Sequence, residues 1–138
     1  MAASSLTRPT MQRKMNIMLN CLCVGLGGFV GSVLRYLVGL IPWKTASGFP
    51  FKTLIINVVG AFLIGLFSAL AQRNSAFDPK LVLFLKVGLC GGFTTFSTFA
   101  YEIGDLFTAG QVLPAVLYAM ISVGAGVLAV FLGQLGIR

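Results

Sequence analysis

The sequence predicts an all-α membrane protein with four transmembrane helices, the third of them broken near Gly91–Thr95. Of its 138 residues, 57% are hydrophobic and only 9% are charged, whereas about a quarter of a soluble domain is Asp, Glu, Lys or Arg. The charged residues leave four long intervals uninterrupted, at 15–34, 53–72, 87–101 and 106–137. Too little polar surface remains for a multidomain enzyme or a nucleic-acid-binding domain in water.

The four charge-free intervals set the expected helices in chain order. A hydrocarbon core about 30 Å thick needs about 20 helical residues, so spans are predicted at roughly 15–41, 52–72, 80–107 and 111–137. Asp78 and Pro79 are suited to start the third span as N-cap and first helical residue, and Gly110 separates the third span from the fourth. Residues 1–14 are expected to be a disordered extension, and residues 15–138 one transmembrane domain.

The positive charges predict the orientation of these spans. The N-terminus, the second loop and the C-terminus share one side, and the first loop lies on the other. The first side carries Arg8, Arg13, Lys14, Arg73, Lys80 and Arg138, and the other carries Lys44 and Lys52. Because Lys and Arg are enriched in cytoplasmic segments, both termini are expected in the cytoplasm.

Polar side chains at membrane depth are candidate functional residues, because burying them in lipid is costly. Asn57 can bind an ion or join two helices by hydrogen bonds. Arg35 can extend to the headgroups or draw anions to an entrance, and Lys86 has the same two interpretations. Cys21, Cys23 and Cys90 are interpreted as packing residues, because an odd number of thiols without any His favours neither a disulfide framework nor a zinc site.

The third span contains the most informative segment, GGFTTFSTFAYE at residues 91–102. Adjacent glycines and hydroxyl residues weaken a helix, and irregular backbone within a membrane is tolerated only inside protein or beside a cavity. Unwound backbone exposes carbonyl oxygens, which are suitable ligands for a monovalent cation. Beyond the break, Phe96 and Phe99 share a helix face, as do Tyr118 and Ser122 in the fourth span.

The nine residues GGFTTFSTF at 91–99 resemble the signature of the Fluc/CrcB family of small bacterial fluoride channels. Supporting matches are the glycine-rich first span ending in Leu34-Arg35-Tyr36, the segment Thr53–Asn57 followed by Gly60, and the fourth span with Tyr118. The resemblance extends from about Ile17 to Gly133, which is nearly the whole chain.

The resemblance implies a passive fluoride channel in the bacterial plasma membrane that relieves fluoride toxicity. It also implies an antiparallel, dual-topology homodimer with a structural sodium ion at its centre and no organic cofactor. The sodium would be held by the backbone carbonyls of Gly91 and Thr94, and Arg35 would be the arginine of the vestibule. Lys86 departs from the family pattern, and the hypothesis for it is that it attracts anions in the vestibule, with extension to the headgroups as the alternative. The fluoride path would include Asn57, Phe96, Phe99, Ser97, Thr98, Tyr118 and Ser122.

These residues suit fluoride, because a small hydrated anion needs hydrogen-bond donors and aromatic edges in place of its water. The sequence offers no arrangement for enzymatic catalysis. The unequal Lys and Arg count leaves open whether the chain pairs with itself or with an oppositely oriented homologue. Two other functions are considered: a small cation-coupled multidrug exporter, which would need a carboxylate in an early span, and a membrane subunit that only packs against partners.

Overall fold

The computed structural model describes residues 4–42, 48–74 and 77–137, with side chains from Thr10 onward. Its elements are α1 (Ser4–Leu40), α2 (Phe51–Arg73), α3 (Pro79–Val82), η1 (Leu83–Cys90), α4 (Gly91–Phe93), α5 (Phe96–Thr108) and α6 (Val112–Leu135). In the described part of the chain, four helical segments are long and apolar enough to cross a membrane: Thr10–Leu40, Phe51–Arg73, Pro79–Thr108 and Val112–Leu135. The four predicted spans are therefore confirmed, and the chain is a multi-pass membrane protein.

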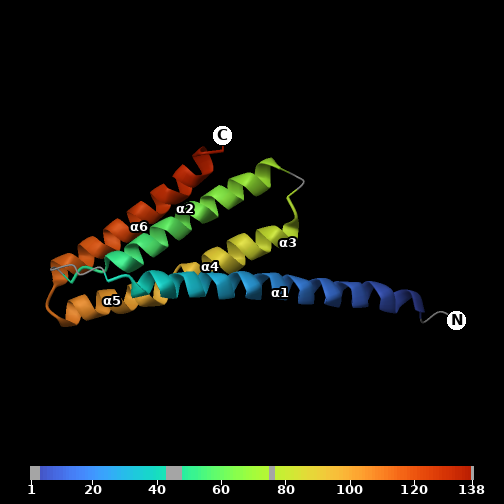
Figure 1. Ribbon diagram of the computed structural model, residues 1–138, viewed down its shortest axis with the longest axis horizontal. Helices are drawn as coiled ribbons and strands as arrows, with labels where there is room; N and C mark the ends of the chain where they lie inside the picture. The colour runs from blue at the N-terminus through green and yellow to red at the C-terminus, as the bar shows by residue number, and fades with distance from the viewer. Residues whose placement is uncertain (1–3, 43–47, 75–76, 138) are drawn as a thin grey trace.

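The helices pack as two pairs (Figure 1). In one pair, α2 lies along α6, and in the other α1 lies along the third span. The ends of the chain and the connection from α2 to α3 lie at one end of the bundle, as the span count requires. Three of the basic residues that predict the orientation are not among the side chains that the structure describes: Arg8, Lys44 and Arg138.

Glycine makes both pairs close enough for backbone contact. A Cβ atom on Gly27 or Gly31 of α1 would collide with the backbone of η1 and α4, and one on Gly65 of α2 would collide with the backbone of α6 at Val130. Gly133 of α6 meets α2 in the same way. Small residues are common where membrane helices cross, because close contact gains van der Waals energy that lipid cannot replace.

Local signals fix the helix ends. The Asp78 side chain accepts a hydrogen bond from the Lys80 backbone N–H at 2.8 Å, and Pro79 occupies the first helical position. This is the predicted N-cap. Gly110 adopts a positive φ of 73° in the turn between α5 and α6, which a residue with a side chain rarely adopts. Both sequence predictions are confirmed.

The first helix is longer than expected. It begins at Ser4, so residues 4–14 are helical where the sequence analysis expects a disordered extension. At 1.5 Å per residue, its 37 residues span about 55 Å, well beyond a hydrocarbon core of about 30 Å. Adding a turn to an existing helix avoids the cost of nucleation. Figure 1 shows this end of α1 projecting past the bundle.

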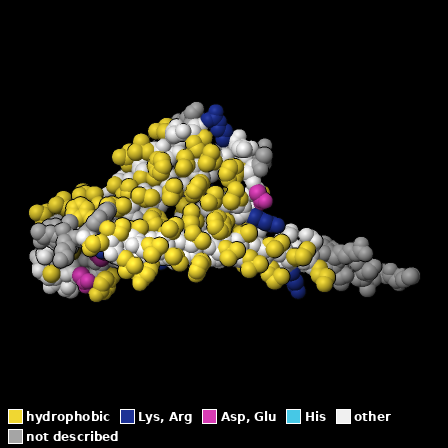
Figure 2. Space-filling model, in the orientation of Figure 1, with side chains coloured by type: hydrophobic (Ala, Val, Ile, Leu, Met, Phe, Trp, Pro, Cys, Tyr) yellow, Lys and Arg dark blue, Asp and Glu magenta, His cyan; other side chains and the backbone are white. Residues whose placement is uncertain are grey.

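Charged side chains lie mainly at the two ends of the molecule, and the visible flank between them is mostly apolar (Figure 2). Many large apolar side chains are exposed on α1 and α6, among them Phe29 and Phe131. An apolar outer surface of this kind is what a bilayer requires.

Candidate functional site: a groove beside the broken third span

The third span is interrupted at two threonines. Thr94 (φ −78°, ψ 159°) and Thr95 (φ −147°, ψ 113°) have extended backbone between α4 and α5. The predicted break is present, but the two glycines before it are helical. The Thr94 backbone N–H and hydroxyl both donate to the Cys90 carbonyl, at 3.0 and 2.9 Å. Thr95 caps α5 by accepting from the Thr98 N–H at 3.2 Å.

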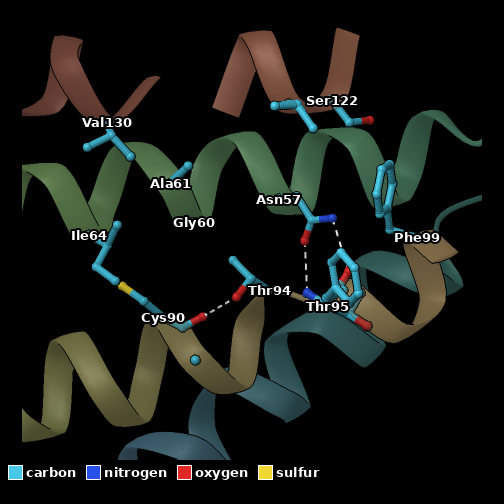
Figure 3. A pocket seen from close by; sticks show the side chains of 13 residues that line it. Asn57, Gly60, Ala61, Ile64, Cys90, Thr94, Thr95, Phe99, Ser122 and Val130 are labelled. Carbon is cyan, nitrogen blue, oxygen red and sulfur yellow. Dashed lines mark hydrogen bonds between the residues drawn. The ribbon is translucent and has the colours of Figure 1, made fainter. Parts of the chain in front are cut away.

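Asn57 of α2 satisfies the backbone at this break. Its side-chain oxygen accepts from the Thr95 N–H at 2.8 Å, and its amide nitrogen donates to the Thr95 carbonyl at 3.1 Å (Figure 3). One side chain thus replaces both hydrogen bonds that Thr95 would otherwise have made in a continuous helix. At membrane depth no water is available for this purpose. Asn57 therefore stabilises the break and connects it to α2.

A groove of about 390 Å³ runs beside the break. Its walls come from α2, the third span and α6, and the residues are Asn57, Gly60, Ala61, Ile64, Cys90, Gly91, Thr94, Thr95, Phe96, Phe99, Ser122, Val123 and Val130. Figure 3 shows Asn57 and Thr94 on opposite sides of it. Gly60 is needed here because a Cβ atom at that position would collide with the Thr94 methyl group.

The groove combines aromatic rings with uncharged polar groups. The Phe96 and Phe99 ring centroids are 5.9 Å apart, and 79% of the Phe96 surface is exposed in the single chain. The Ser122 hydroxyl oxygen is buried and has no hydrogen-bond partner among the described residues. Because this oxygen is itself buried, the Ser122 side chain would have to rotate before it could bind a ligand in the groove.

A buried network supports one end of the groove. The two Glu102 carboxyl oxygens accept from the Thr53 hydroxyl at 2.6 Å and the Tyr118 hydroxyl at 2.7 Å. The Tyr118 side chain is fully buried, and its ring centroid lies 5.2 Å from that of Phe99. Glu102 therefore joins α2, α5 and α6, and Tyr118 fixes the position of Phe99.

Comparison of the sequence with known proteins identifies its family. Residues 22–134 match the family described as CrcB-like protein, Camphor Resistance (CrcB). The chain is similar to the fluoride-specific ion channel FluC of Chlorobaculum tepidum, with 48% identity over 86% of this chain and 94% of the relative. It is 46% identical to the protein of that name from Chlorobium phaeobacteroides, over 82% of this chain and 88% of the relative. A third such relative, from Shewanella halifaxensis, is 45% identical over 85% of this chain and 94% of its own length.

The chain belongs to the CrcB family. The resemblance that the nine-residue motif indicates is thereby confirmed. In this CrcB protein the structure brings together six of the residues predicted from the sequence, because the groove is lined by Asn57, Gly91, Thr94, Phe96, Phe99 and Ser122.

The other predicted residues of the CrcB chain lie outside the groove lining. Ser97 and Thr98 are exposed and lie beside the Thr95 hydroxyl, at 3.4 and 2.9 Å. Tyr118 lies behind Phe99 in the buried network. Arg35, near the end of α1, and Lys86, in η1, are both partly exposed. Along the direction of the spans, Lys86 lies on one side of the break and Arg35 lies on the other.

A cation in this groove would have to use backbone oxygens. No group of three or more His, Cys, Asp or Glu side chains suited to a metal lies within the described ranges. Gly91 and Thr94 both line the groove, and the helix that ends at Phe93 leaves its last carbonyls without helical partners. These oxygens are chemically suited to a monovalent cation, so Gly91 and Thr94 fit the sodium ion that the resemblance implies.

Sequence reasoning did not assign a role to Thr53 or Glu102. Glu102 is 49 residues from Thr53 and 16 from Tyr118, so the network depends on tertiary contacts. The sequence did contain a signal for Glu102. A carboxyl group near the end of an apolar span needs hydrogen-bond donors. Because no basic residue lies within a turn of Glu102 in the sequence, those donors had to come from other helices.

Proposed function

We propose that this chain is a subunit of a fluoride-selective channel that lets fluoride leave the cell passively through the bacterial plasma membrane. The groove beside the broken third span carries the proposal, because it offers aromatic edges and an unpartnered hydroxyl without a fixed charge. The relatives named fluoride-specific ion channels support the identity of the ion.

The groove chemistry suits a small anion that must shed its water. Hydroxyl and amide groups donate hydrogen bonds to fluoride, and the positive edges of aromatic rings add weak attraction. A fixed Arg or Lys side chain at the narrowest point would bind fluoride too tightly, because conduction requires sites that release the ion. Asn57, Ser122, Phe96 and Phe99 would form the path, with Ser97, Thr98 and Tyr118 around it. Arg35 and Lys86 would raise the anion concentration at the entrances.

The channel would be a dimer of two antiparallel copies. Phe96 is largely exposed on the single chain, so a second copy would cover the groove and enclose an ion path. A sodium ion would then lie between the subunits, held by the Gly91 and Thr94 carbonyls of each. It would supply positive charge that offsets repulsion between these carbonyls. Whether the second subunit is an identical chain or an oppositely oriented homologue is decided by the orientation experiment in the Discussion.

The two other functions fit the geometry less well. A cation-coupled exporter needs a carboxyl group free to exchange protons for a cationic substrate, whereas both Glu102 oxygens accept hydrogen bonds from Thr53 and Tyr118. A subunit that only packs against partners would explain the glycine contacts. It would not explain a buried, unpartnered hydroxyl at Ser122.

Fluoride efflux from liposomes containing this chain tests the proposal. An electrode measures released fluoride, and chloride-loaded liposomes provide the selectivity control. Where two copies can insert in opposite directions, as in reconstitution from detergent, we expect rapid fluoride release without chloride release. Ser122→Ala should slow the efflux at least severalfold, because it removes a hydroxyl group from the lining of the groove.

Ser68→Ala is the matched control. The Ser68 hydroxyl donates to the Ile64 carbonyl of its own helix at 2.6 Å, and Ser68 is not among the groove residues. Its efflux should equal that of the unaltered chain. Release of chloride together with fluoride would contradict selectivity, and equal slowing by both substitutions would contradict the role of Ser122.

A further inference from the structure

A second pocket lies at the end of the molecule opposite the Glu102 network. It has a volume of about 420 Å³ and lies between the C-terminal ends of α2 and α6, which Figure 1 shows side by side. Its lining residues are Ala69, Gln72, Arg73, Gln134 and Ile137. None of these residues lines the groove beside the break, so the pocket is separate from the proposed ion path.

The helix crossing beneath the pocket fixes its width. Gly65 and Gly133 hold α2 and α6 in backbone contact, and the pocket residues follow within about two turns of Gly65 and about one turn of Gly133. Above this crossing, an Arg73 Nη1 donates to the Ile137 carbonyl. That bond joins the two helix ends and holds the guanidinium against one wall of the pocket.

The pocket presents donors on one side and apolar surface on another. Arg73 has five N–H donors, and the bond to Ile137 uses one nitrogen, so other donors remain for a ligand. Gln72 and Gln134 add two carboxamide groups. Ala69 and Ile137 supply carbon surface beside them. A ligand with an anionic, oxygen-rich head and an adjoining apolar chain would satisfy both parts.

The surroundings of the pocket also favour an anionic ligand. The described basic side chains at this end of the molecule are Arg13, Lys14, Arg73 and Lys80. Among the side chains described there, the acidic residue is Asp78, which is already engaged as the cap of α3. Figure 2 shows the Lys and Arg side chains gathered at this end on the visible face.

We propose that this pocket binds the phosphate of an anionic phospholipid of the adjoining leaflet, with Arg73 as its main ligand. Guanidinium groups bind phosphate oxygens through two parallel hydrogen bonds, and basic pockets between helices on the cytoplasmic side suit such headgroups. The lipid glycerol would contact Gln72 and Gln134, and its acyl chain would leave along the apolar wall. The site is independent of fluoride conduction.

Lipid retention measured by native mass spectrometry tests the site. The purified full chain is exchanged into detergent micelles containing either phosphatidylglycerol or phosphatidylcholine, and bound lipids are counted. We expect phosphatidylglycerol to be retained preferentially. Arg73→Gln should weaken its retention about tenfold, the size expected for a lost charge-assisted hydrogen bond of about 1.5 kcal/mol.

Lys80→Gln is the matched control, because Lys80 is a basic residue at the same end that does not line the pocket. It should retain phosphatidylglycerol like the unaltered chain. Gln134→Leu is a second variant, which keeps Arg73 and its bond to Ile137 and should reduce retention severalfold. This variant decides the matter if Arg73→Gln impairs folding.

Three results would overturn the proposal. Equal retention of the two lipids would exclude a headgroup-specific site. Equal weakening by the Arg73 and Lys80 substitutions would indicate diffuse surface charge. Displacement of phosphatidylglycerol by millimolar inorganic phosphate would indicate a site for a free anion, without a role for the lipid chain.

Discussion

Asn57 is the residue on which the interrupted backbone most depends. In the single chain its amide makes two hydrogen bonds to Thr95, at 2.8 and 3.1 Å. Asn57→Ala would leave a backbone donor and a backbone acceptor without partners in a place that water reaches poorly. We expect a loss of about 2–4 kcal/mol in the free energy of unfolding, from about 1–2 kcal/mol per unsatisfied group. Unfolding of the reconstituted protein by denaturing detergent measures this loss.

Ala61→Ser provides a comparison for the Asn57 variant, because it alters a groove residue whose side chain makes no hydrogen bond to the break. Its stability should stay within about 0.5 kcal/mol of the unaltered chain. If Asn57→Ala were equally stable, the two hydrogen bonds would not hold the break, and the carbonyls near Gly91 and Thr94 would be fixed by other contacts.

Substitution of a single residue, Tyr118, tests the buried network around Glu102. Tyr118→Phe retains the ring contacts with Phe99 and Phe49, at centroid distances of 5.2 and 5.3 Å, but removes the donor to Glu102. We expect it to reduce the free energy of unfolding by about 1–2 kcal/mol. Because Thr53 donates to the same carboxyl group, combining Tyr118→Phe with Thr53→Ala should give a non-additive effect in a double-mutant cycle. Strict additivity would show that the two hydroxyl groups act independently.

The helix crossings give a prediction at the scale of elements. Gly31 contacts the third span so closely that an added Cβ would collide with backbone at Leu89. Gly31→Ala must therefore separate α1 from α4, and we expect a loss of about 1–3 kcal/mol in stability, as for other overpacked sites. Thermal unfolding of the purified protein in detergent, compared between variants, measures the loss.

Gly25 is the internal control for this crossing. It lies in the same helix, but an added Cβ there meets nothing within 4 Å. Gly25→Ala should be neutral or slightly stabilising, because Ala favours helix over Gly. Equal effects at Gly25 and Gly31 would mean that helix propensity, and not contact with the third span, determines the outcome.

The same scale shows what the sequence could predict. The four spans follow from charge-free intervals, because a bilayer excludes charges regardless of tertiary detail. The Asp78-Pro79 helix start and the Gly110 turn were predictable for a similar reason, since capping and positive φ depend on neighbouring residues. The break was predicted near Gly91–Thr95 from the paired glycines and the hydroxyl residues, and it falls at the end of that range, at Thr94 and Thr95. Gly92 remains helical where its backbone packs against Gly28 of α1, whereas Gly91 makes no such contact and continues the same helical turn.

Contacts between distant residues could not be predicted in this way. The sequence indicated that Asn57 needs partners, but not that both are backbone groups of Thr95. It placed Tyr118 in the ion path, whereas in the single chain the side chain lies fully buried behind Phe99. Glu102 went unassigned because its partners come from two other helices. Patterns within one span identify candidate polar residues, and helix packing selects their partners.

For the whole molecule, the uneven distribution of charge predicts a single orientation. Arg13, Lys14, Arg73 and Lys80 lie at the end that carries the termini, whereas Lys52 at the other end donates to the Gly39 carbonyl at 2.8 Å. The positive-inside rule then places both termini in the cytoplasm. A C-terminal green fluorescent protein should fluoresce in cells, and a C-terminal alkaline phosphatase, which folds only outside, should be inactive.

The orientation experiment also decides how the proposed antiparallel dimer is assembled. If the chain inserts one way only, liposomes prepared from cell membranes that contain it alone should release little fluoride, and co-expression with an oppositely oriented homologue should restore the release. Replacing Arg13 and Lys14 with Gln weakens the charge bias without touching the groove, so the phosphatase fusion should gain activity and efflux should appear without a partner. Both fusions active in the unaltered chain would instead mean dual insertion. The chain would then supply its own inverted copy, and the cluster of basic residues would serve the lipid headgroups and not the topology.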